Sequence, residues 1–290
     1  MKYPSGKTAI SYPRGRKKAP ESSGKESAIK QPVAVVADSV ACLTHELAEQ
    51  YDIGVIPINF YAGGKLYHDW VDITPTEAYK LFLEEPDSFK TSAASPEECL
   101  DALRTASRKA ESILCVTISN KLSMQHDSVQ HARRMAENAL SGVRIEVLDS
   151  LQATSSEGMV ALAAARAAAE GKDMEEVISA AEYVRDNVRV VMFLDTLRHV
   201  YRSGRIPKIA SKIGAALNIK PMLTVNGTVR FLGIARTRKQ GIARIMRMLR
   251  DEADTKPVHV AVTHAYALEE AERLRDRIAS EFNCTELWLS

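Results

Sequence analysis

Short apolar runs alternate with helical segments over the first two-thirds of this chain. Residues 33–36 are a continuous run of Val and Ala, residues 113–118 are nearly as apolar, and apolar side chains recur through 143–148. A continuous run of this kind is typical of a strand that is buried on both faces of a sheet. A helical pattern at 124–140 separates the second run from the third. This βαβ order predicts an α/β fold whose N-terminal domain contains a mostly parallel, Rossmann-like sheet.

The pattern changes near residue 188. A new strand is predicted at 189–194, and the Asn226-Gly227 pair predicts a hairpin through a tight turn. The segments predicted to complete the chain are a helix at 239–252, a strand at 258–263 and a helix at 267–282. A hairpin among βα units predicts a second domain with a mixed α/β sheet. We therefore expect two domains, one of residues 32–187 and one of residues 188–290.

Residues 1–31 are rich in Ser, Gly, Pro and Lys and contain almost no large aliphatic side chains. Such a segment cannot bury enough apolar surface to offset its ordering entropy, so we predict a disordered basic tail. The tail holds eight Lys or Arg and two Glu, a surplus of six in a chain of net charge +2. The remainder therefore carries about −4 (+2 minus +6), which argues against a nucleic-acid partner.

Four cysteines, Cys42, Cys99, Cys115 and Cys284, are scattered without a C-x-x-C pair. This usage fits a reducing cytoplasm better than a secreted, disulfide-linked fold. The N-terminal segment lacks the apolar core of a secretory signal, and no apolar stretch approaches the ~20 residues of a membrane span. The sequence therefore predicts a cytoplasmic protein without a membrane span.

Two hydroxyl-rich stretches adjoin predicted strands. Residues 91–96 have the sequence Thr-Ser-Ala-Ala-Ser-Pro, and Ser119 and Ser123 follow the apolar run at 113–118. Ligands of parallel α/β sheets bind beyond the carboxyl ends of the strands. Hydroxyls placed there can donate hydrogen bonds to a small anionic group such as a carboxylate. The two stretches therefore indicate a binding site for an acid.

No nucleophile–base set accompanies these hydroxyls, which favours a binding site over a catalytic one. The chain lacks G-x-S-x-G, a P-loop and G-x-G-x-x-G, and its seven histidines show no metal-ligand spacing. We therefore expect no metal and no cofactor apart from a bound ligand. The alternative function is a hydroxyl-nucleophile hydrolase or a phosphotransferase that acts on a small acidic substrate.

Nine short motifs follow one another along the chain. They are Asp38-Ser39, residues 56–58, residues 69–73, residues 91–96, residues 118–123, residues 147–150, Ser203-Gly204-Arg205-Ile206, residues 217–221 and residues 236–239. In their order and spacing they closely resemble the DegV family of bacterial fatty-acid-binding proteins. The resemblance runs from about Val33 to the C-terminus, some nine-tenths of the chain.

The resemblance implies a two-domain protein that holds a long-chain fatty acid of about 16 to 18 carbons, with the carboxylate between the domains and the acyl chain in a tunnel. Some members present that acid to a separate kinase, which makes an acyl phosphate. The resemblance therefore implies a lipid-binding protein, not an enzyme, with a fatty-acid kinase as a partner. The family continues past its last strand into a Gly- and His-rich segment that closes over the head group. This chain stops at Trp288-Leu289-Ser290. Either the sequence is truncated or this member has lost that wall.

On this match, Thr91 and Ser92 correspond to the family's T-S-x-P-S carboxylate-binding loop, and Ser123 corresponds to the serine of its L-S-G-T motif. The departures from these motifs are Ala94 for a proline, Met124 for a glycine, and Gln125-His126 for a Thr-Tyr pair. The alternative interpretation is structural: Thr91, Ser92 and Ser95 would only cap the helix that begins at Pro96, and Ser123 would be an N-cap.

Four further residues are candidate ligand or partner contacts, namely Ser119, Arg205, Arg236 and His264. Each also has a purely structural interpretation. Ser119 ends a strand, Arg205 lies in a turn with a solvated charge, and Arg236 belongs to a solvated basic run. His264 follows a strand, where a histidine is more often satisfied by the fold than engaged in chemistry.

Overall fold

The computed structural model describes residues 30–196, 203–206 and 219–290. The predicted tail therefore lies outside the described residues except for its last two positions, and Gln31 already belongs to the first strand. Motif residues 217 and 218 lie outside them as well.

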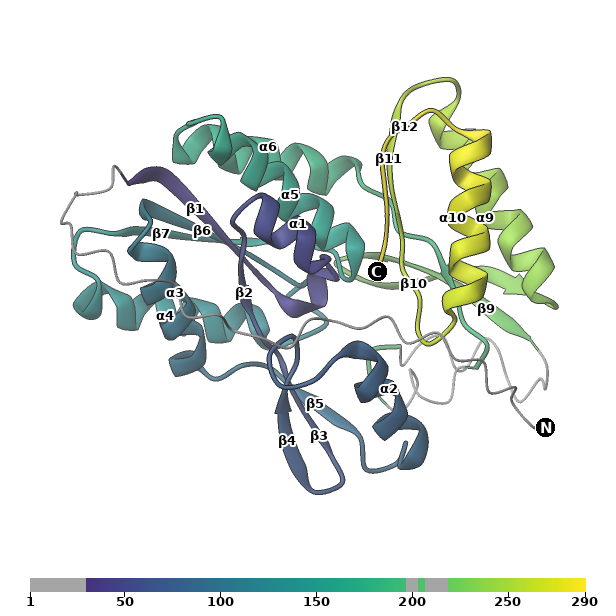
Figure 1. The fold of residues 1–290 in the computed structure, drawn as a ribbon, viewed down its shortest axis with the longest axis horizontal. Coiled ribbons are helices and arrows are strands. Elements are labelled where there is room, and N and C mark those ends of the chain that lie inside the picture. The colour runs from purple at the N-terminus through teal and green to yellow at the C-terminus, as the bar shows by residue number, and fades with distance from the viewer. Residues whose placement is uncertain (1–29, 197–202, 207–218) are drawn as a thin grey trace, which may run out of the picture.

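A four-stranded parallel sheet forms the centre of the N-terminal half (Figure 1). Its strands, in spatial order, are β2 (Gly54–Ile56), β1 (Gln31–Asp38), β6 (Ala110–Thr117) and β7 (Arg144–Asp149). β1 pairs with β2 and β6, and β6 pairs with β7, all in parallel register. The parallel sheet predicted from the apolar runs is confirmed.

Helices cover both faces of this sheet, and each face has its own apolar core. One layer consists of α1 (His45–Gln50), α5 (Ser155–Ala169) and α6 (Met174–Asn187), and the other of α3 (Pro96–Ser107) and α4 (Gln125–Ala139). The alanine-rich α5 packs closely on β1 because its side chains are small. At Gly158 of α5, any side chain would collide with the backbone carbonyl of Ala41 in the short 3-10 helix η1 (Ser39–Ala41). The small residues of α5 therefore allow this helix to lie close to β1 and η1.

A small antiparallel sheet, which the sequence did not predict, extends from the edge of the N-terminal half. Its strands are β4 (Lys65–His68), β3 (Asn59–Ala62) and β5 (Lys90–Ser92), and α2 (Pro75–Glu84) lies in the connection between β4 and β5. The apolar segment 53–60 is divided between β2 and β3, because Pro57 has no N–H group to continue a ladder. The turn between β3 and β4 contains Gly63 and Gly64, both at positive φ.

The C-terminal half contains two further sheets. Three antiparallel strands, β8 (Met192–Phe193), β9 (Lys220–Asn226) and β10 (Thr228–Ala235), form one, and the parallel pair β11 (Val258–Val262) and β12 (Cys284–Leu289) forms the other. The helices are α9 (Arg238–Ala253) and α10 (Leu268–Glu281). The hairpin at Asn226-Gly227 is as predicted, whereas β12 extends the chain beyond the helix that was expected to end it.

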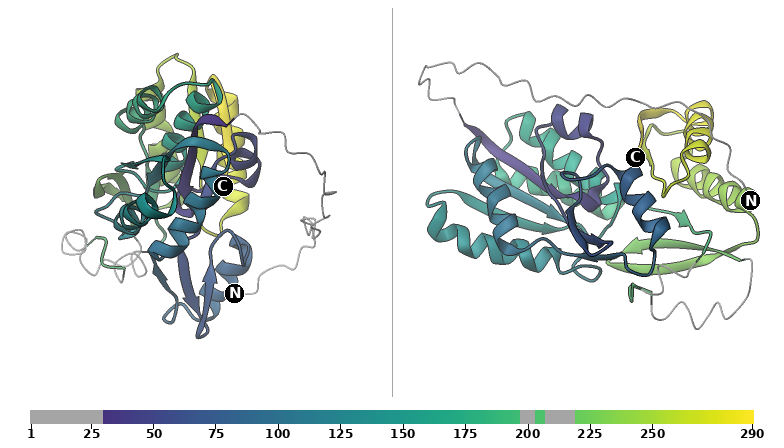
Figure 2. Two further views of the ribbon diagram at one scale, coloured as in Figure 1. Left: turned by 90° about the vertical axis from the view of Figure 1, so that its left-hand side faces the viewer. Right: turned by 60° about the horizontal axis from the view of Figure 1, so that its bottom comes forward.

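The α/β fold is therefore confirmed. In the C-terminal half, antiparallel and parallel strand pairs occur in two separate sheets. Figure 2 shows the β9–β10 hairpin beyond the end of the central sheet at which the parallel strands finish. Among the described helices, none is both long and apolar enough to cross a membrane.

Candidate functional site

The carboxyl edge of the central sheet meets the C-terminal half through backbone and hydroxyl contacts. Ser119, in the loop after β6, donates from Oγ to the carbonyl oxygen of Gly227 at 2.6 Å. The N–H of Gly227 donates to the carbonyl of Leu151, in the loop after β7, at 2.7 Å. Gly227 is the tip of the β9–β10 hairpin, where its φ of 67° suits a glycine. The hairpin tip therefore closes onto the edge where ligands of such sheets bind.

Apolar side chains from both halves gather at this junction. Three buried residues, Ile118, Ala153 and Val225, form the centre of the group. The partly buried side chains packed on them are Val40, Leu122, Val190, Met192 and Val229. Met192 and Val229 also pack on a second group around Ile206 and Leu223. The junction thus contains a packed apolar group beside the hydroxyl-bearing loops.

The structure places Thr91 and Ser92 in strand β5, opposite Phe60 and Asn59 of β3. Both residues are exposed, and among the described residues their hydroxyls have no hydrogen-bond partner. Ser95 is different, because its Oγ accepts the N–H of Glu98 while the Glu98 carboxylate accepts the N–H of Ser95. The capping interpretation therefore describes Ser95, and not Thr91 or Ser92.

Ser123 lies half-buried just before α4. Its Oγ accepts a hydrogen bond from the N–H of Gln125 at 3.2 Å, while the residue between them, Met124, is exposed and makes no side-chain cap. A hydroxyl that accepts one hydrogen bond still has its own proton to donate. Ser123 can therefore help to start the helix and also contact a ligand.

Gln125 connects the two hydroxyl stretches. Its side chain is fully buried, and its Oε1 accepts the N–H of Ala94 at 2.9 Å, between Ser92 and Ser95. Its backbone N–H reaches Ser123, so one residue contacts both stretches. In the sequence, Gln125 stands out only as a departure from a family motif. The signal for its burial was its position one turn before Val129 on the apolar face of α4.

Two buried acids lie beneath the same edge. Asp38 ends β1, and its carboxylate accepts the N–H of Val40 at 3.0 Å and the N–H of Ile118 at 2.9 Å. Burial raises the pKa of Asp38 to about 6. The hydrogen bond to Ile118 fixes the start of the loop that carries Ser119 and Ser123. Asp38 is therefore a structural support of the site.

The second acid is Glu157, in the first turn of α5. It is fully buried, and neither carboxyl oxygen has a hydrogen-bond partner in the described part of the chain. Burial, followed by the nearby charge of Asp38, raises the pKa of Glu157 well above its ordinary value. The raised pKa of Glu157 favours its protonated form, so that two negative charges are not buried side by side. No sequence pattern singled out Glu157.

Of the four further candidate contacts, Ser119 and Arg205 lie at the junction of the two halves. Ser119 is fully buried, and its hydroxyl donates to the carbonyl oxygen of Gly227. It therefore stabilises the contact between the two halves. Arg205 is exposed, and its guanidinium donates to the carbonyl of Leu122 at 3.0 Å, which places it beside the loop of Ser123.

Arg236 and His264 have local contacts of their own. Arg236 is exposed after β10, where its backbone N–H donates to Gln240. His264 follows β11, and its Nδ1 accepts the N–H of Ala267 at 3.2 Å, just before α10. Burial lowers the pKa of His264, which keeps its ring neutral and able to accept. This hydrogen bond agrees with the structural interpretation of His264, in which the fold itself satisfies the ring.

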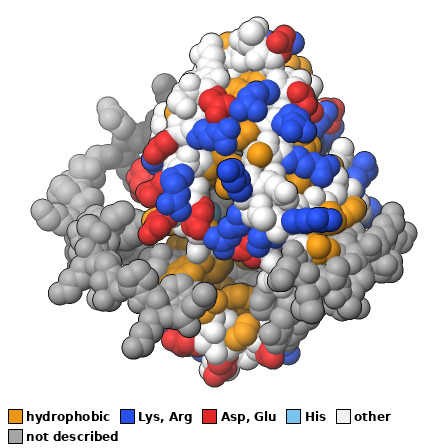
Figure 3. All heavy atoms as spheres, turned by 90° about the vertical axis from the view of Figure 1, so that its right-hand side faces the viewer, with side chains coloured by type: hydrophobic (Ala, Val, Ile, Leu, Met, Phe, Trp, Pro, Cys, Tyr) orange, Lys and Arg blue, Asp and Glu red, His pale blue; other side chains and the backbone are white. Residues whose placement is uncertain are grey.

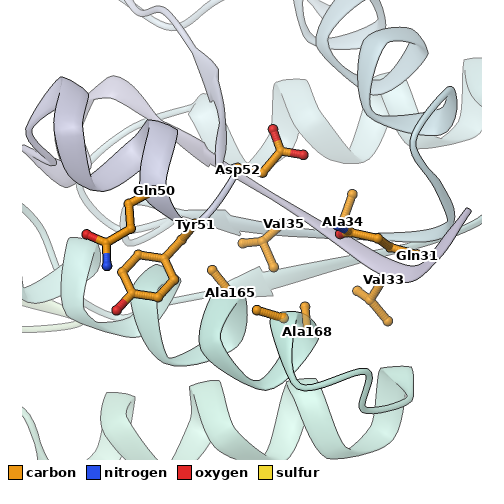
Figure 4. Close-up of a pocket in the computed structure, with 10 residues that line it drawn as sticks. Gln31, Val33, Ala34, Val35, Gln50, Tyr51, Asp52, Ala165 and Ala168 are labelled. Carbon is orange, nitrogen blue, oxygen red and sulfur yellow. The ribbon is translucent and has the colours of Figure 1, made fainter.

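A hollow of about 100 Å³ lies at the opposite end of β1 (Figure 4). Val33 and Val35 of β1, Tyr51 and Asp52 after α1, and Ala165 of α5 are among its lining residues. Pockets for ligands of drug size have volumes of about 300–1,000 Å³. This hollow is too small for a long acyl chain, and it lies away from the hydroxyl stretches.

Comparisons with known proteins agree on one family. The sequence profile described as "Uncharacterised protein, DegV family" matches residues 32–289. A DegV domain-containing protein of Caldanaerobacter subterraneus is 32% identical over 88% of this chain and 90% of its own length.

Solved structures give the same result. A DegV family protein from Thermus thermophilus, described as fatty-acid binding, is 30% identical with a TM-score of 0.79, over 89% of this chain and 92% of that one. A stearic-acid-binding protein from Eubacterium ventriosum is 25% identical with a TM-score of 0.78, over 86% of this chain and 87% of that one.

Proposed function

Because this chain belongs to the DegV family, we propose that it binds a long-chain fatty acid at the junction of its two halves and does not itself catalyse a reaction. The observation that carries the proposal is the position of Gln125. It connects two stretches of hydroxyl donors, and the second of them leads directly into the apolar group that both halves share. The relatives from T. thermophilus and E. ventriosum, described as binding fatty acid and stearic acid, support the same ligand class.

The acyl chain would supply most of the affinity. Burying about fourteen methylenes at ~0.8 kcal/mol each gives a gross ~11 kcal/mol. That exceeds the cost of desolvating one carboxylate whose oxygens receive hydrogen bonds. The apolar group around Ile118 and Val225 is where the chain would lie, since it extends from one half into the other.

The hydroxyls of Thr91, Ser92 and Ser123 would bind the carboxylate. The first two have no partner among the described residues, and Ser123 has a proton to donate. The N–H of Gln125 polarises the Ser123 hydroxyl, because a hydroxyl that accepts a hydrogen bond becomes a better donor. Such an arrangement binds an acid in preference to a neutral lipid.

We propose further that the protein presents its fatty acid to a fatty-acid kinase. Support comes from the turn of residues 203–206, which is tied to the carbonyl of Leu122 through Arg205. The Arg205 side chain is exposed there, next to the loop of Ser123. A partner that docked on this turn would reach the head group without crossing the apolar group.

The enzyme alternative has one observation in its favour. Thr117 Oγ1 lies 3.0 Å from Nδ1 of His126, which is a hydroxyl–histidine contact. Thr117 is fully buried within β6, however, and the other ring nitrogen of His126 faces Gln130, not an acid. A buried hydroxyl without an orienting carboxylate is a poor nucleophile. We therefore favour binding over catalysis.

The test is a titration of lipid-free protein with a long-chain fatty acid. Thr91→Ala and Ser123→Ala should each weaken binding by roughly ten- to a hundredfold, because one donor to a charged group contributes about 1.5–3 kcal/mol. Ser95→Ala is the matched control, since it removes a helix cap and should lower stability by about 1 kcal/mol without a change in affinity. Equal affinities in all four proteins would show that these hydroxyls do not hold the carboxylate.

A further inference from the structure

The residues of β9, β10 and α9 carry a strong positive charge. Residues 219–256 contain nine Lys or Arg and three Asp or Glu, a net charge of +6 in a chain of net +2. Figure 3 shows the face on which α9 and α10 lie, with Lys and Arg side chains gathered over it. Charge that is segregated in this way attracts anionic partners.

A groove between β10 and α9 lies within this basic region. It has a volume of about 290 Å³, and its lining residues are Ile234, Ala235, Gln240, Ala243, Arg244 and Arg247. No acidic side chain is among them. Ile234 is 46% exposed, so an apolar surface adjoins the two guanidinium groups. The groove can hold a small anionic group together with part of the molecule that carries it.

The backbone of β10 is shaped around Arg244. The strand has a bulge between Phe231 and Gly233, and Arg244 donates from Nη2 to the carbonyl of Leu232 at 2.8 Å. Gly233 has a φ of 144°, and a Cβ there would lie 2.5 Å from Nη1 of Arg244. Glycine at this position therefore makes room for the guanidinium, which is held in place by the bulge.

The arginines of α9 differ in whether they form ion pairs with acidic side chains. Arg238, at the start of the helix, pairs with Asp195 and Glu270, and Arg250, in its last turn, pairs with Glu281. Arg244 and Arg247 lie between them and have no acidic partner in the part of the chain that the structure describes. The two unneutralised arginines are the two that line the groove.

We propose that the β10–α9 groove binds a phosphate group. Guanidinium groups recognise phosphate with paired, charge-assisted hydrogen bonds, and two of them on successive turns can share one phosphate. Gln240 adds an amide at the same groove, and Ile234 accommodates the organic part of the ligand. The phosphate belongs either to a soluble phosphate ester or to the head group of a phospholipid. This site is separate from the proposed fatty-acid site and does not depend on it.

The experiment uses two probes at fixed ionic strength. Glycerol 3-phosphate is titrated in solution, and vesicles of phosphatidylglycerol are compared with vesicles of phosphatidylcholine. The key variant is Arg247→Gln, because Arg247 is exposed and lines the groove. Its matched control is Arg250→Gln, which removes the same charge from the same helix outside the groove.

We expect at least one probe to bind saturably, and Arg247→Gln to weaken that binding by roughly tenfold. Arg250→Gln should change it less than about twofold. Saturable binding of glycerol 3-phosphate would identify a soluble ester, and binding of phosphatidylglycerol vesicles alone would identify a lipid head group. The proposal is overturned if neither probe binds, or if both variants weaken binding equally, because the second result would mean that only net charge matters.

Discussion

Gln125→Ala tests the connection between the two hydroxyl stretches. The substitution leaves the N–H of Ala94 without its acceptor, at a position that is only 1% exposed. An unsatisfied buried donor costs about 1–3 kcal/mol. Truncation of a fully buried side chain adds a cavity, so we expect a total loss of about 2–4 kcal/mol of unfolding free energy. Fatty-acid affinity should fall by roughly tenfold or more, because the hydroxyls of Thr91 and Ser123 are then no longer held together.

Gln125→Met separates the hydrogen bond from the cavity, since methionine has a similar volume and no strong acceptor. It should retain part of the stability and still lose affinity. Asn138→Ala, which truncates an exposed amide on the same helix, is the matched control and should change neither quantity. Urea denaturation gives the stability, and titration with a fatty acid gives the affinity. If Gln125→Met binds as tightly as the natural protein, the hydrogen bond to Ala94 has no role in the site.

Two further predictions concern the packing of α5. Relative to the natural protein, Glu157→Gln should become progressively more stable as the pH rises above the ordinary pKa of glutamate. The carboxyl ionises there in the unfolded chain, whereas burial raises the pKa of Glu157 in the folded protein, so the natural protein loses stability as the pH rises. Denaturation at several pH values would contradict the assignment if the difference in stability were independent of pH. Gly158→Ala should destabilise the protein by about 1–3 kcal/mol, because the new Cβ meets the carbonyl of Ala41, and an unchanged melting temperature would show that α5 can move away from η1.

The central sheet could be predicted because its strands are buried on both faces. β1 and β6 therefore appear in the sequence as continuous apolar runs between helical segments. The small sheet has no such pattern. β5 consists of three exposed residues and depends on pairing with β3, some thirty residues earlier in the chain. The small sheet forms because β5 pairs with β3, and no short segment of the sequence contains both strands.

In the candidate site, too, some residues could be proposed from the sequence and others could not. Thr91, Ser92 and Ser123 were proposed as ligands from the family resemblance, and their places beside strand ends agree with the ligand edge of a parallel sheet. The groups that support them were missed, because their partners are distant in sequence. Gln125 meets Ala94 across 31 positions, and Asp38 meets Ile118 across 80. Only the packed fold reveals that a glutamine and an aspartate hold the two loops in place.

The comparison of a long-chain fatty acid with the alcohol of the same chain length tests the central claim most directly. Both ligands would bury the same methylenes against the apolar group around Ile118 and Val225, and only the acid offers a carboxylate to Thr91, Ser92 and Ser123. Titration of lipid-free protein should therefore give an affinity for the acid that is at least about tenfold higher than for the alcohol. Equal affinities, or no binding of either ligand, would contradict a carboxylate site at this junction.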